Sequence, residues 1–262
     1  MFLEGKNLAD KIFSKLAESP APRGALCVIF IGDDKTSALY IAKKKEAAEK
    51  LKVEFKLLAL PAKTSQDELV REIEKLNSSS RVSGILVQMP LPNKIDRFEV
   101  AAKITPEKDV DGFNYIANGS GRTVPPTVLA IDELLDFYKI KKLAKKILIV
   151  GRGFLVGRPL ETFWQFKGYD IEVMDRESQN YSKKLKEAEI VVVATGGGRK
   201  FSFNDFSPNS VIIDASTVAE EGALWGDVSL IGWPGNIRLA PTPGGVGPVT
   251  VAMLYRNFYS LK

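Results

Sequence analysis

Residues 146–159 read KILIVGRGFLVGRP, an apolar run that stops at a glycine and resumes as an apolar helical pattern. Ile147 to Val150 are aliphatic without alternation, which is typical of a parallel strand buried on both faces. Gly151, Gly153 and Gly157 follow with the spacing of the dinucleotide-binding fingerprint. Such glycines allow a tight turn, a close approach of backbone to a pyrophosphate, and a helix whose N-terminus faces the anion. The same spacing also occurs in structural loops, so the rest of the chain must support a nucleotide site.

On both sides of this stretch, apolar runs typical of buried strands alternate with helical patterns, which indicates a doubly wound α/β fold. The predicted strands are residues 25–31, 53–60, 84–88, 147–150, 171–175, 189–195 and 211–216. The predicted helices lie within 1–16, at 38–51, 65–76, 123–138 and 182–187, after the glycines to about 167, and from about 246. Thr36 or Ser37 is the expected cap of the helix at 38–51. In such sheets, ligands bind at the carboxyl ends of the strands.

The composition is that of an ordinary globular protein, with 262 residues, 45% hydrophobic and 26% charged. No apolar run approaches the ~20 residues of a membrane span, and the N-terminus lacks the regions of a signal peptide, so a cytoplasmic location without membrane partners is expected. The single Cys27 cannot pair within the chain. Histidine is absent, so acid/base work falls to Lys, Tyr, Asp or Glu, and no metal site is predicted.

The net charge of +5 is mild, although Lys43–Lys45 and Lys141–Lys146 form basic runs. Such runs are typical of solvated helix faces, and no aromatic residues interleave with them as in a nucleic-acid site. We therefore expect an anionic small molecule as the ligand, and no nucleic acid.

Several loops coincide with one family. The stretches are, in chain order, GDDKTSALYIAKKKEAAEKL, GILVQMPLP, KDVDGFN, VGRGFLVGRP, AEIVVVATG and PTPGGVGPVTVAML. Over nearly its whole length the chain resembles the bifunctional methylenetetrahydrofolate dehydrogenase/methenyltetrahydrofolate cyclohydrolases. The resemblance implies two α/β domains: a folate domain of residues 1–113 and 243–262, and a Rossmann-like, doubly wound nucleotide domain of residues 114–242.

The resemblance also implies two reactions and a homodimer. In the first, 5,10-methylenetetrahydrofolate is oxidised to the 5,10-methenyl form with NADP as cofactor, NAD being the alternative. In the second, the methenyl product is hydrolysed to 10-formyltetrahydrofolate. The partners that it implies are therefore one-carbon derivatives of tetrahydrofolate.

On the folate side, Tyr40 and Lys44 lie one helical turn apart and so project from one face. Hydrolysis of the methenyl carbon needs a water that loses a proton, and a partly desolvated lysine of lowered pKa can accept it. The amide of Gln88, at a strand end, would hydrogen-bond Lys44, and Asp111 would accept two parallel hydrogen bonds from a pterin edge. The resemblance implies a catalytic set of Lys44, Tyr40, Gln88 and Asp111, and substrate contacts from Tyr40, Asp109, Asp111, Pro243, Gly244 and Gly245.

On the cofactor side, the residues implied are Gly151, Arg152, Gly153, Gly157, Asp175, Arg176, Thr195, Thr217 and Thr250. Here the chain departs from the family pattern: Gly153 replaces a usual serine, residues 214–217 read DAST instead of Asp-Val-Gly-Ile, and residues 125–128 read PPTV instead of Pro-Cys-Thr-Pro. Asp175 would accept from a ribose 2′-OH and favour NAD, whereas Arg176 with Arg152 would favour NADP. These two signals conflict.

Three alternatives stay open. The chain could be a single-activity member of the family, either an NAD-linked dehydrogenase or a cyclohydrolase with an impaired cofactor site. It could be another two-domain dehydrogenase of the shikimate type, which would not explain the combination of Tyr40/Lys44, QMPLP and KDVDG. It could also be a non-catalytic protein that binds folate or nucleotide.

Overall fold

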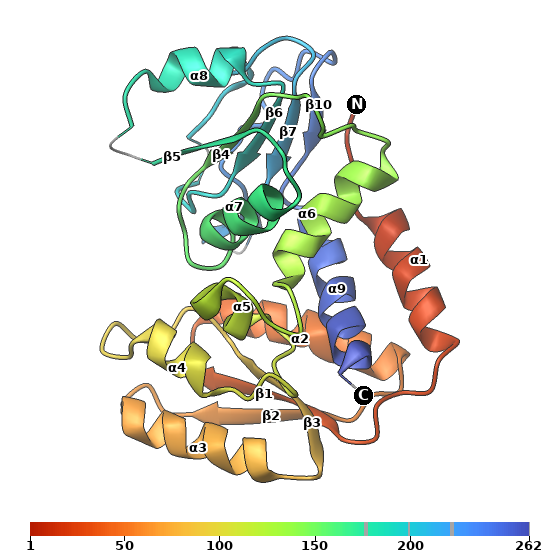
Figure 1. Ribbon diagram of the computed structural model, residues 1–262, viewed down its shortest axis with the longest axis vertical. Coiled ribbons are helices and arrows are strands. Elements are labelled where there is room, and N and C mark those ends of the chain that lie inside the picture. The colour runs from red at the N-terminus through yellow and green to blue at the C-terminus, as the bar shows by residue number, and fades with distance from the viewer. Residues whose placement is uncertain (176–177, 199, 221–222, 262) are drawn as a thin grey trace. The chain divides into compact units, whose positions relative to one another are not determined.

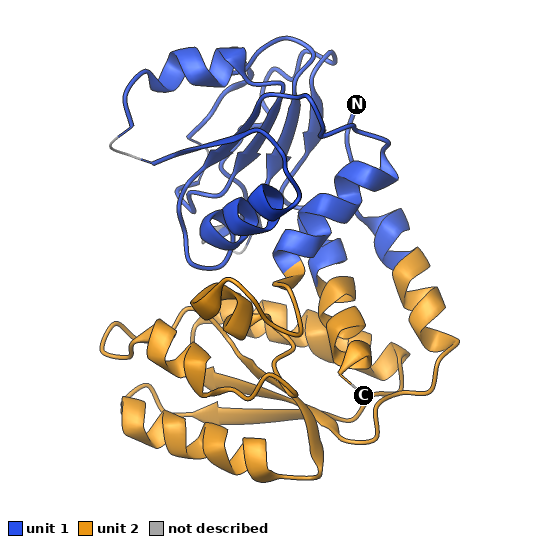
Figure 2. Cartoon of the chain, viewed as in Figure 1, with its two compact units in different colours: residues 1–10, 127–250 blue, residues 11–126, 251–262 orange. Residues whose placement is uncertain are grey.

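The computed structural model describes residues 1–175, 178–198, 200–220 and 223–261 (Figure 1). The chain forms two compact units (Figure 2): unit 1 contains residues 1–10 and 127–250, and unit 2 contains residues 11–126 and 251–262. The chain passes between them within α1 (Lys6–Ala17), after the first residue of α6 (Pro126–Phe137), and within α9 (Val246–Ser260).

This division differs from the predicted domain boundaries at the N-terminus, at residues 114–126 and at residues 243–250. The N-terminal segment lies along β10 (Arg238–Ala240), where Leu3 N donates to Leu239 O at 2.7 Å. Residues 114–126 belong with unit 2, where Asn257 Nδ2 on α9 donates to Val124 O at 2.9 Å. Hydrogen bonds between segments that are far apart in the sequence therefore hold these residues in their units. No change in composition marks the boundaries between the units.

Unit 2 is built on a three-stranded parallel sheet with the order β2-β1-β3. The predicted strand–helix alternation is thus confirmed here. Its remaining elements are, in chain order, β1 (Ala25–Ile31), α2 (Lys35–Lys50), β2 (Phe55–Leu60), α3 (Gln66–Ser78), β3 (Val82–Val87), α4 (Arg97–Lys103) and α5 (Phe113–Asn118).

The core of unit 2 packs α2 and α9 against the sheet. Leu26 and Val28 of β1 lie in one buried cluster with Ile41 of α2 and Leu254 of α9. Gly84 lets α9 approach β3 closely, because a Cβ there would lie 2.6 Å from a ring carbon of Phe258. Removing these aliphatic groups from water is the main stabilising contribution to the unit.

Unit 1 contains a five-stranded parallel sheet with the order β10-β7-β6-β4-β5. Besides β10, its elements are β4 (Ile147–Val150), α7 (Gly157–Phe166), β5 (Ile171–Met174), α8 (Tyr181–Glu187), β6 (Ile190–Val193), the 3₁₀ turn η1 (Phe203–Asp205), β7 (Val211–Asp214), β8 (Val218–Glu220) and β9 (Ala223–Trp225). The first strand of this sheet in chain order is β4. The next strand, β5, pairs with it on one side, and β6, β7 and β10 follow on the other side. The order reverses between β4 and β6, and doubly wound sheets bind ligands at the carboxyl ends of strands at such a point.

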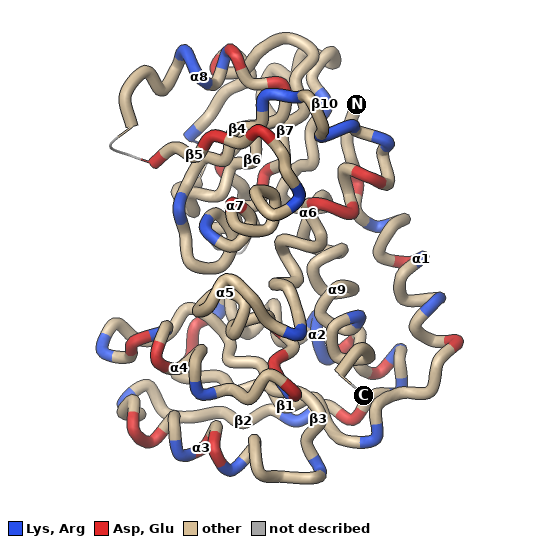
Figure 3. Tube along the Cα trace, viewed as in Figure 1, with Lys and Arg blue, Asp and Glu red and all other residues tan. Residues whose placement is uncertain are grey.

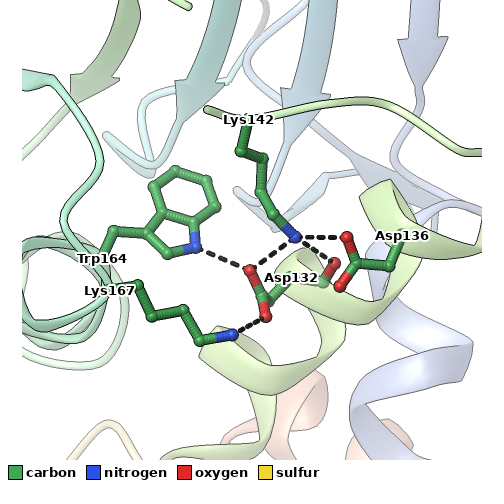
Figure 4. A network of polar contacts seen from close by, with 5 residues as sticks. All are labelled: Asp132, Asp136, Lys142, Trp164 and Lys167. Carbon is green, nitrogen blue, oxygen red and sulfur yellow. Dashed lines mark hydrogen bonds and ion pairs between the residues drawn. The ribbon is translucent and has the colours of Figure 1, made fainter. Parts of the chain in front are cut away.

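A buried polar network joins α6 to α7 in unit 1 (Figure 4). Asp132 accepts from Trp164 Nε1 at 2.9 Å and pairs with Lys142 at 2.8 Å and with Lys167 at 2.5 Å. Burial alone would raise the pKa of Asp132, but hydrogen bonds from Lys142, Lys167 and Trp164 outweigh it and lower that pKa. The network fixes α7 by its carboxyl-terminal half and so helps to set where its N-terminus lies.

The structure corrects several local predictions. Lys and Arg recur along the connection from α6 to β4 (Figure 3), yet residues 141–146 form no helix and the Lys142 side chain is only 4% exposed. The N-cap of α2 is Asp34, which accepts from Ser37 N, instead of Thr36 or Ser37. The short elements α4, α5, β8, β9 and β10 were not predicted, because three to seven residues carry too little periodicity. Among the described residues, no helix is long and apolar enough to cross a membrane.

Candidate active site

Lys44 and Gln88 meet in unit 2 at the carboxyl end of β3. The Lys44 Nζ on α2 donates to Gln88 Oε1 at 2.9 Å, which is the hydrogen bond expected from the sequence. Gln88 Nε2 donates to Met89 O at 2.7 Å, which orients the amide with its oxygen toward Lys44. A neutral acceptor holds the amine without adding the negative charge that would stabilise the ammonium form.

Both ends of this part of α2 are anchored. At the start of the helix, Asp34 Oδ1 accepts from Ser37 N at 2.7 Å, and the buried Ser37 hydroxyl donates to Met89 O at 3.4 Å. The Tyr255 hydroxyl on α9 donates to the Lys44 carbonyl at 2.6 Å. The side chain of Tyr40, one turn before Lys44, is partly buried and has the Lys43 amine 5.8 Å from its ring centroid. The helix is therefore fixed where it carries Tyr40 and Lys44.

Lys44 and Asp111 influence each other's charge. Burial lowers the pKa of the Lys44 amine, and the negative charge of Asp111 opposes that shift. Burial raises the pKa of Asp111 to about 6, Lys44 opposes this, and Asp109 adds to it. A larger neutral fraction of Lys44 near neutral pH suits a group that must accept a proton.

The two acids of the KDVDG loop have different surroundings. Asp109 is 1% exposed, and its carboxylate accepts from Phe113 N at 3.0 Å and from Asn114 N at 2.7 Å at the start of α5. These hydrogen bonds let Asp109 shape the loop that carries Asp111, and its contact with substrate stays a prediction. Gly112, with φ of +70°, completes the turn, because a Cβ there would lie 2.5 Å from Pro125 N. Asp111 itself is only partly buried.

In unit 1, the three glycines of the fingerprint have distinct roles. Gly151 has φ of +111°, and a Cβ there would lie 2.4 Å from Ala194 O. At Gly157, the first residue of α7, a Cβ would lie 1.9 Å from Gly151 O. At Gly153 the nearest atom to a Cβ is Ala194 O at 3.9 Å, so the residue there is free to be larger. Gly151 and Gly157 thus form the turn and the close strand–helix contact, while Gly153 leaves open space beside them.

The other residues predicted to bind the cofactor include three that follow strands of the unit 1 sheet. Arg152 is half exposed and has a guanidinium nitrogen 3.9 Å from Glu161 Oε1. Asp175 follows β5, and its Oδ1 accepts from the Ser178 hydroxyl at 3.0 Å. Thr217 follows β7 and is partly buried. Arg176 lies outside the described residues.

Two of the predicted threonines use their hydroxyl groups within the protein. The Thr195 hydroxyl donates to Asp227 Oδ2 at 2.7 Å, and the Thr250 hydroxyl donates to Val246 O at 3.2 Å within α9. In the loop that enters α9, Gly245 N donates to Pro241 O at 2.7 Å, and Gly244 has φ of +106° with no atom near its Cβ position. Pro243 precedes these glycines in a loop of unit 1.

Sequence reasoning missed a pair of buried acids, Asp214 and Asp227. Asp214 is the last residue of β7, and its carboxylate accepts a hydrogen bond from Val228 N at 2.8 Å. Asp227 accepts hydrogen bonds from the backbone of the loop that follows β6. Burial raises the pKa of Asp214 to about 7. Hydrogen bonds from backbone N–H groups oppose this shift, and the charge of Asp227 adds to it. No spacing in the sequence indicates this pair of acids, because their hydrogen-bond donors come from separate stretches of the chain. Among the described residues, no cluster of acid or cysteine side chains is placed to hold a metal ion.

The fold and these residues define a class: an α/β protein with a nucleotide-type sheet in one unit and a lysine of lowered pKa in the other. Residues 3–111 match the family model described as tetrahydrofolate dehydrogenase/cyclohydrolase, catalytic domain, and residues 125–262 match the one described as its NAD(P)-binding domain. The chain therefore belongs to the tetrahydrofolate dehydrogenase/cyclohydrolase family. The resemblance and the fold class predicted from the sequence are confirmed.

Individual relatives agree over almost the full length. The chain is 35% identical to the bifunctional protein FolD of Bdellovibrio bacteriovorus, over 98% of this chain and 94% of the relative. The crystal structure of the bifunctional enzyme FolD from Campylobacter jejuni has a TM-score of 0.90 at 32% identity, covering 100% of this chain and 98% of the other. The methylenetetrahydrofolate dehydrogenase-cyclohydrolase of Trypanosoma brucei, complexed with NADP cofactor and an inhibitor, has a TM-score of 0.90 at 28% identity, with coverages of 100% and 96%.

Proposed function

We propose that this chain oxidises 5,10-methylenetetrahydrofolate to the 5,10-methenyl form with NADP⁺, and then hydrolyses the methenyl product to 10-formyltetrahydrofolate. The observation that carries the proposal is the Lys44–Gln88 hydrogen bond beside Asp111, in a chain that belongs to this family. The nucleotide-binding unit supplies the second requirement.

Hydrolysis needs a proton acceptor next to the methenyl carbon. The neutral amine of Lys44 accepts a proton from water as the water oxygen bonds to that carbon. The proton then passes to the folate N5 as the bond between N5 and the carbon breaks. The hydroxyl proton of the adduct is released to solvent as its oxygen becomes the carbonyl of the formyl group on N10. Gln88 holds the amine in place, the Tyr40 ring stacks along the folate, and Asp111 accepts two hydrogen bonds from the pterin edge.

For the oxidation, the protein positions two ligands. Bound NADP⁺ would supply the nicotinamide ring as hydride acceptor for the methylene carbon. The turn at Gly151 and the open space at Gly153, at the start of α7, fit a pyrophosphate. We assign the pyrophosphate to Gly151–Gly157 and the ribose end to Asp175 and Arg152. Thr217, Thr250 and Pro243–Gly245 are proposed to border the nicotinamide and the folate.

The same resemblance supports a homodimer that acts on one-carbon derivatives of tetrahydrofolate. The sequence pattern supports a cytoplasmic location without membrane or nucleic-acid partners. Light scattering of the purified protein tests the dimer. A monomeric mass at assay concentration would contradict it.

The decisive experiment adds methylenetetrahydrofolate to purified protein with NADP⁺ or NAD⁺ and follows absorbance of the reduced nicotinamide. We expect growth that depends on the folate substrate, followed by decay of the methenyl absorbance. Hydrolysis without reduction of either cofactor would leave a cyclohydrolase with an impaired cofactor site. Reduction without hydrolysis would leave a dehydrogenase only, and folate binding without either reaction would leave a non-catalytic binding protein.

A further inference from the structure

The carboxylate of Asp227 is the centre of a dense set of hydrogen bonds in unit 1. Its side chain is 0% exposed. The donors are the backbone N–H groups of four consecutive residues, Thr195 at 2.9 Å, Gly196 at 3.1 Å, Gly197 at 2.8 Å and Gly198 at 2.8 Å, together with the hydroxyls of Thr195 and Ser216. The loop that follows β6 is therefore wrapped around one buried anion.

These donors compensate the charge of Asp227. Burial alone would raise its pKa, but hydrogen bonds from Ser216, Thr195 and the loop backbone outweigh burial and lower the pKa. Among the ion pairs of the described residues, none includes Asp227. Successive N–H groups of this kind elsewhere form anion-binding nests for phosphate. Here the protein's own carboxylate fills the nest, so the loop is shaped from within.

The loop is in direct contact with the nucleotide fingerprint. Ala194, which precedes the wrapped residues, has its carbonyl oxygen 2.4 Å from the Cβ position of Gly151. Gly151 in turn has its carbonyl oxygen 1.9 Å from the Cβ position of Gly157, where α7 begins. The loop, the turn and the start of α7 thus pack so closely that neither Gly151 nor Gly157 has room for a methyl group. They meet where β4 and β6 end, at the reversal of strand order.

We propose that Asp227 is a positioning residue for the nicotinamide nucleotide. It acts through the Ala194–Gly198 loop, which supports Gly151 and thereby the pyrophosphate turn, and it does not touch the cofactor itself. The inference rests on the proposed dehydrogenase function. Ser216 has a secondary part, because its hydroxyl donates to Asp227 and accepts from Gly196 N at 3.2 Å.

Asp227→Asn tests the proposal with little change of shape. The amide replaces one acceptor oxygen by a donor NH₂ group, which faces N–H groups on either side of the carboxylate. A buried donor left without its acceptor is costly, so the loop should shift and the KM for NADP⁺ should rise about tenfold or more. The kcat at saturating NADP⁺ should change much less. Methenyl hydrolysis, whose proposed base Lys44 lies in unit 2, should stay within about twofold of wild type and so reports folding of the same molecules.

Two further variants complete the test. Asp205→Asn is the matched control, because the hydrogen bonds that its carboxylate accepts among the described residues come from Ser202, whose N–H lies at 2.7 Å in the same unit. It should leave the KM for NADP⁺ unchanged. Ser216→Ala removes one donor and should raise the KM by a smaller factor, about two- to fivefold. This milder variant decides the question if Asp227→Asn fails to fold.

Direct binding of NADPH, measured by energy transfer from tryptophan to the reduced nicotinamide, separates the two hypotheses. Wild type that binds NADPH, with weaker binding in Asp227→Asn, supports the inference. Equal affinities in wild type and folded Asp227→Asn overturn the inference alone. If Asp227→Asn does not fold, an unchanged KM in Ser216→Ala overturns it. Wild type that binds neither NADPH nor NADH overturns the proposed dehydrogenase function together with the inference.

Discussion

The amine of Lys44 and the side-chain oxygen of Gln88 are joined by a 2.9 Å hydrogen bond between the middle of α2 and the end of β3. The two residues are 44 positions apart in the chain, and the parallel sheet brings them together. Because the amide is neutral, it orients the amine while burial lowers its pKa. The pair can therefore hold a proton acceptor in a fixed position.

Lys44→Ala should abolish methenyl hydrolysis while some hydride transfer persists. The variant lacks the proposed general base, and proton transfer of this kind contributes about 10²–10⁴-fold in rate. Absorbance assays of both reactions on one preparation measure the effect. Lys45→Ala, which removes the exposed neighbouring amine on α2, is the control and should behave as wild type. Hydrolysis retained in Lys44→Ala would remove Lys44 from the proposed role.

Asp111→Asn should shift the pH dependence of hydrolysis toward lower pH. The negative charge of Asp111 raises the pKa of Lys44, so its removal lets burial lower that pKa further. Since the neutral amine is the active form, kcat at saturating substrate should begin to rise at a lower pH. Glu107→Gln, which neutralises an exposed acid of the same loop, should leave the profile in place. A profile that stays or moves upward in Asp111→Asn would contradict the proposed coupling.

Asp214→Asn should remove part of the pH dependence of stability. The folded-state pKa of Asp214 is raised from 3.8 to about 7, so the folded protein binds its proton more strongly than the unfolded chain does. This contribution is full below the unfolded value and is lost as pH rises through about 7, with a slope of at most about 1.4 kcal/mol per pH unit. Thermal unfolding of wild type and variant from acid to neutral pH measures it. Parallel curves would show that Asp214 does not titrate in this way.

Gly157→Ala and Gly153→Ser should have opposite outcomes, although both add a Cβ to the fingerprint. At Gly157 the new atom would lie 1.9 Å from a backbone oxygen, so the turn must move, and NADP⁺ binding should weaken about tenfold or more. At Gly153 the nearest atom is 3.9 Å away, so serine should be accommodated with little loss. Titration with NADPH checks both. Similar affinities in the two variants would contradict the roles assigned to these glycines.

Asp132→Asn should destabilise unit 1 strongly. Two ammonium groups and the Trp164 N–H meet at this carboxylate, and breaking a buried ion pair from one side costs about 3–5 kcal/mol. Lys145→Ala breaks an ion pair with Glu189 whose two side chains are 43% and 45% exposed, and it should cost less than about 1 kcal/mol. Denaturant unfolding of both variants gives the comparison. Equal losses would mean that the buried network contributes no more than a surface pair.

The longer elements were predictable because their periodicity is strong. The run at 25–31 matches β1 at both ends, and the apolar residues 147–150 match β4. Short elements such as α5 were missed, because α5 begins where the buried Asp109 accepts two backbone N–H groups, a contact that no local pattern reveals. The same contact gives Asp109 a part in the shape of the loop that carries Asp111.

The sequence by itself determined the alternation of strands and helices, the family, and the positions of Lys44, Gln88 and the fingerprint glycines, because these depend on local order along the chain. Only the tertiary structure decided which groups meet. In the fold, the Lys44 amine hydrogen-bonds Gln88 and lies near the charge of Asp111. The loop after β6 donates hydrogen bonds to Asp227 and packs against Gly151. Burial and hydrogen bonding between distant segments determine the charge states and the shape of both sites, and neither is encoded in any single stretch.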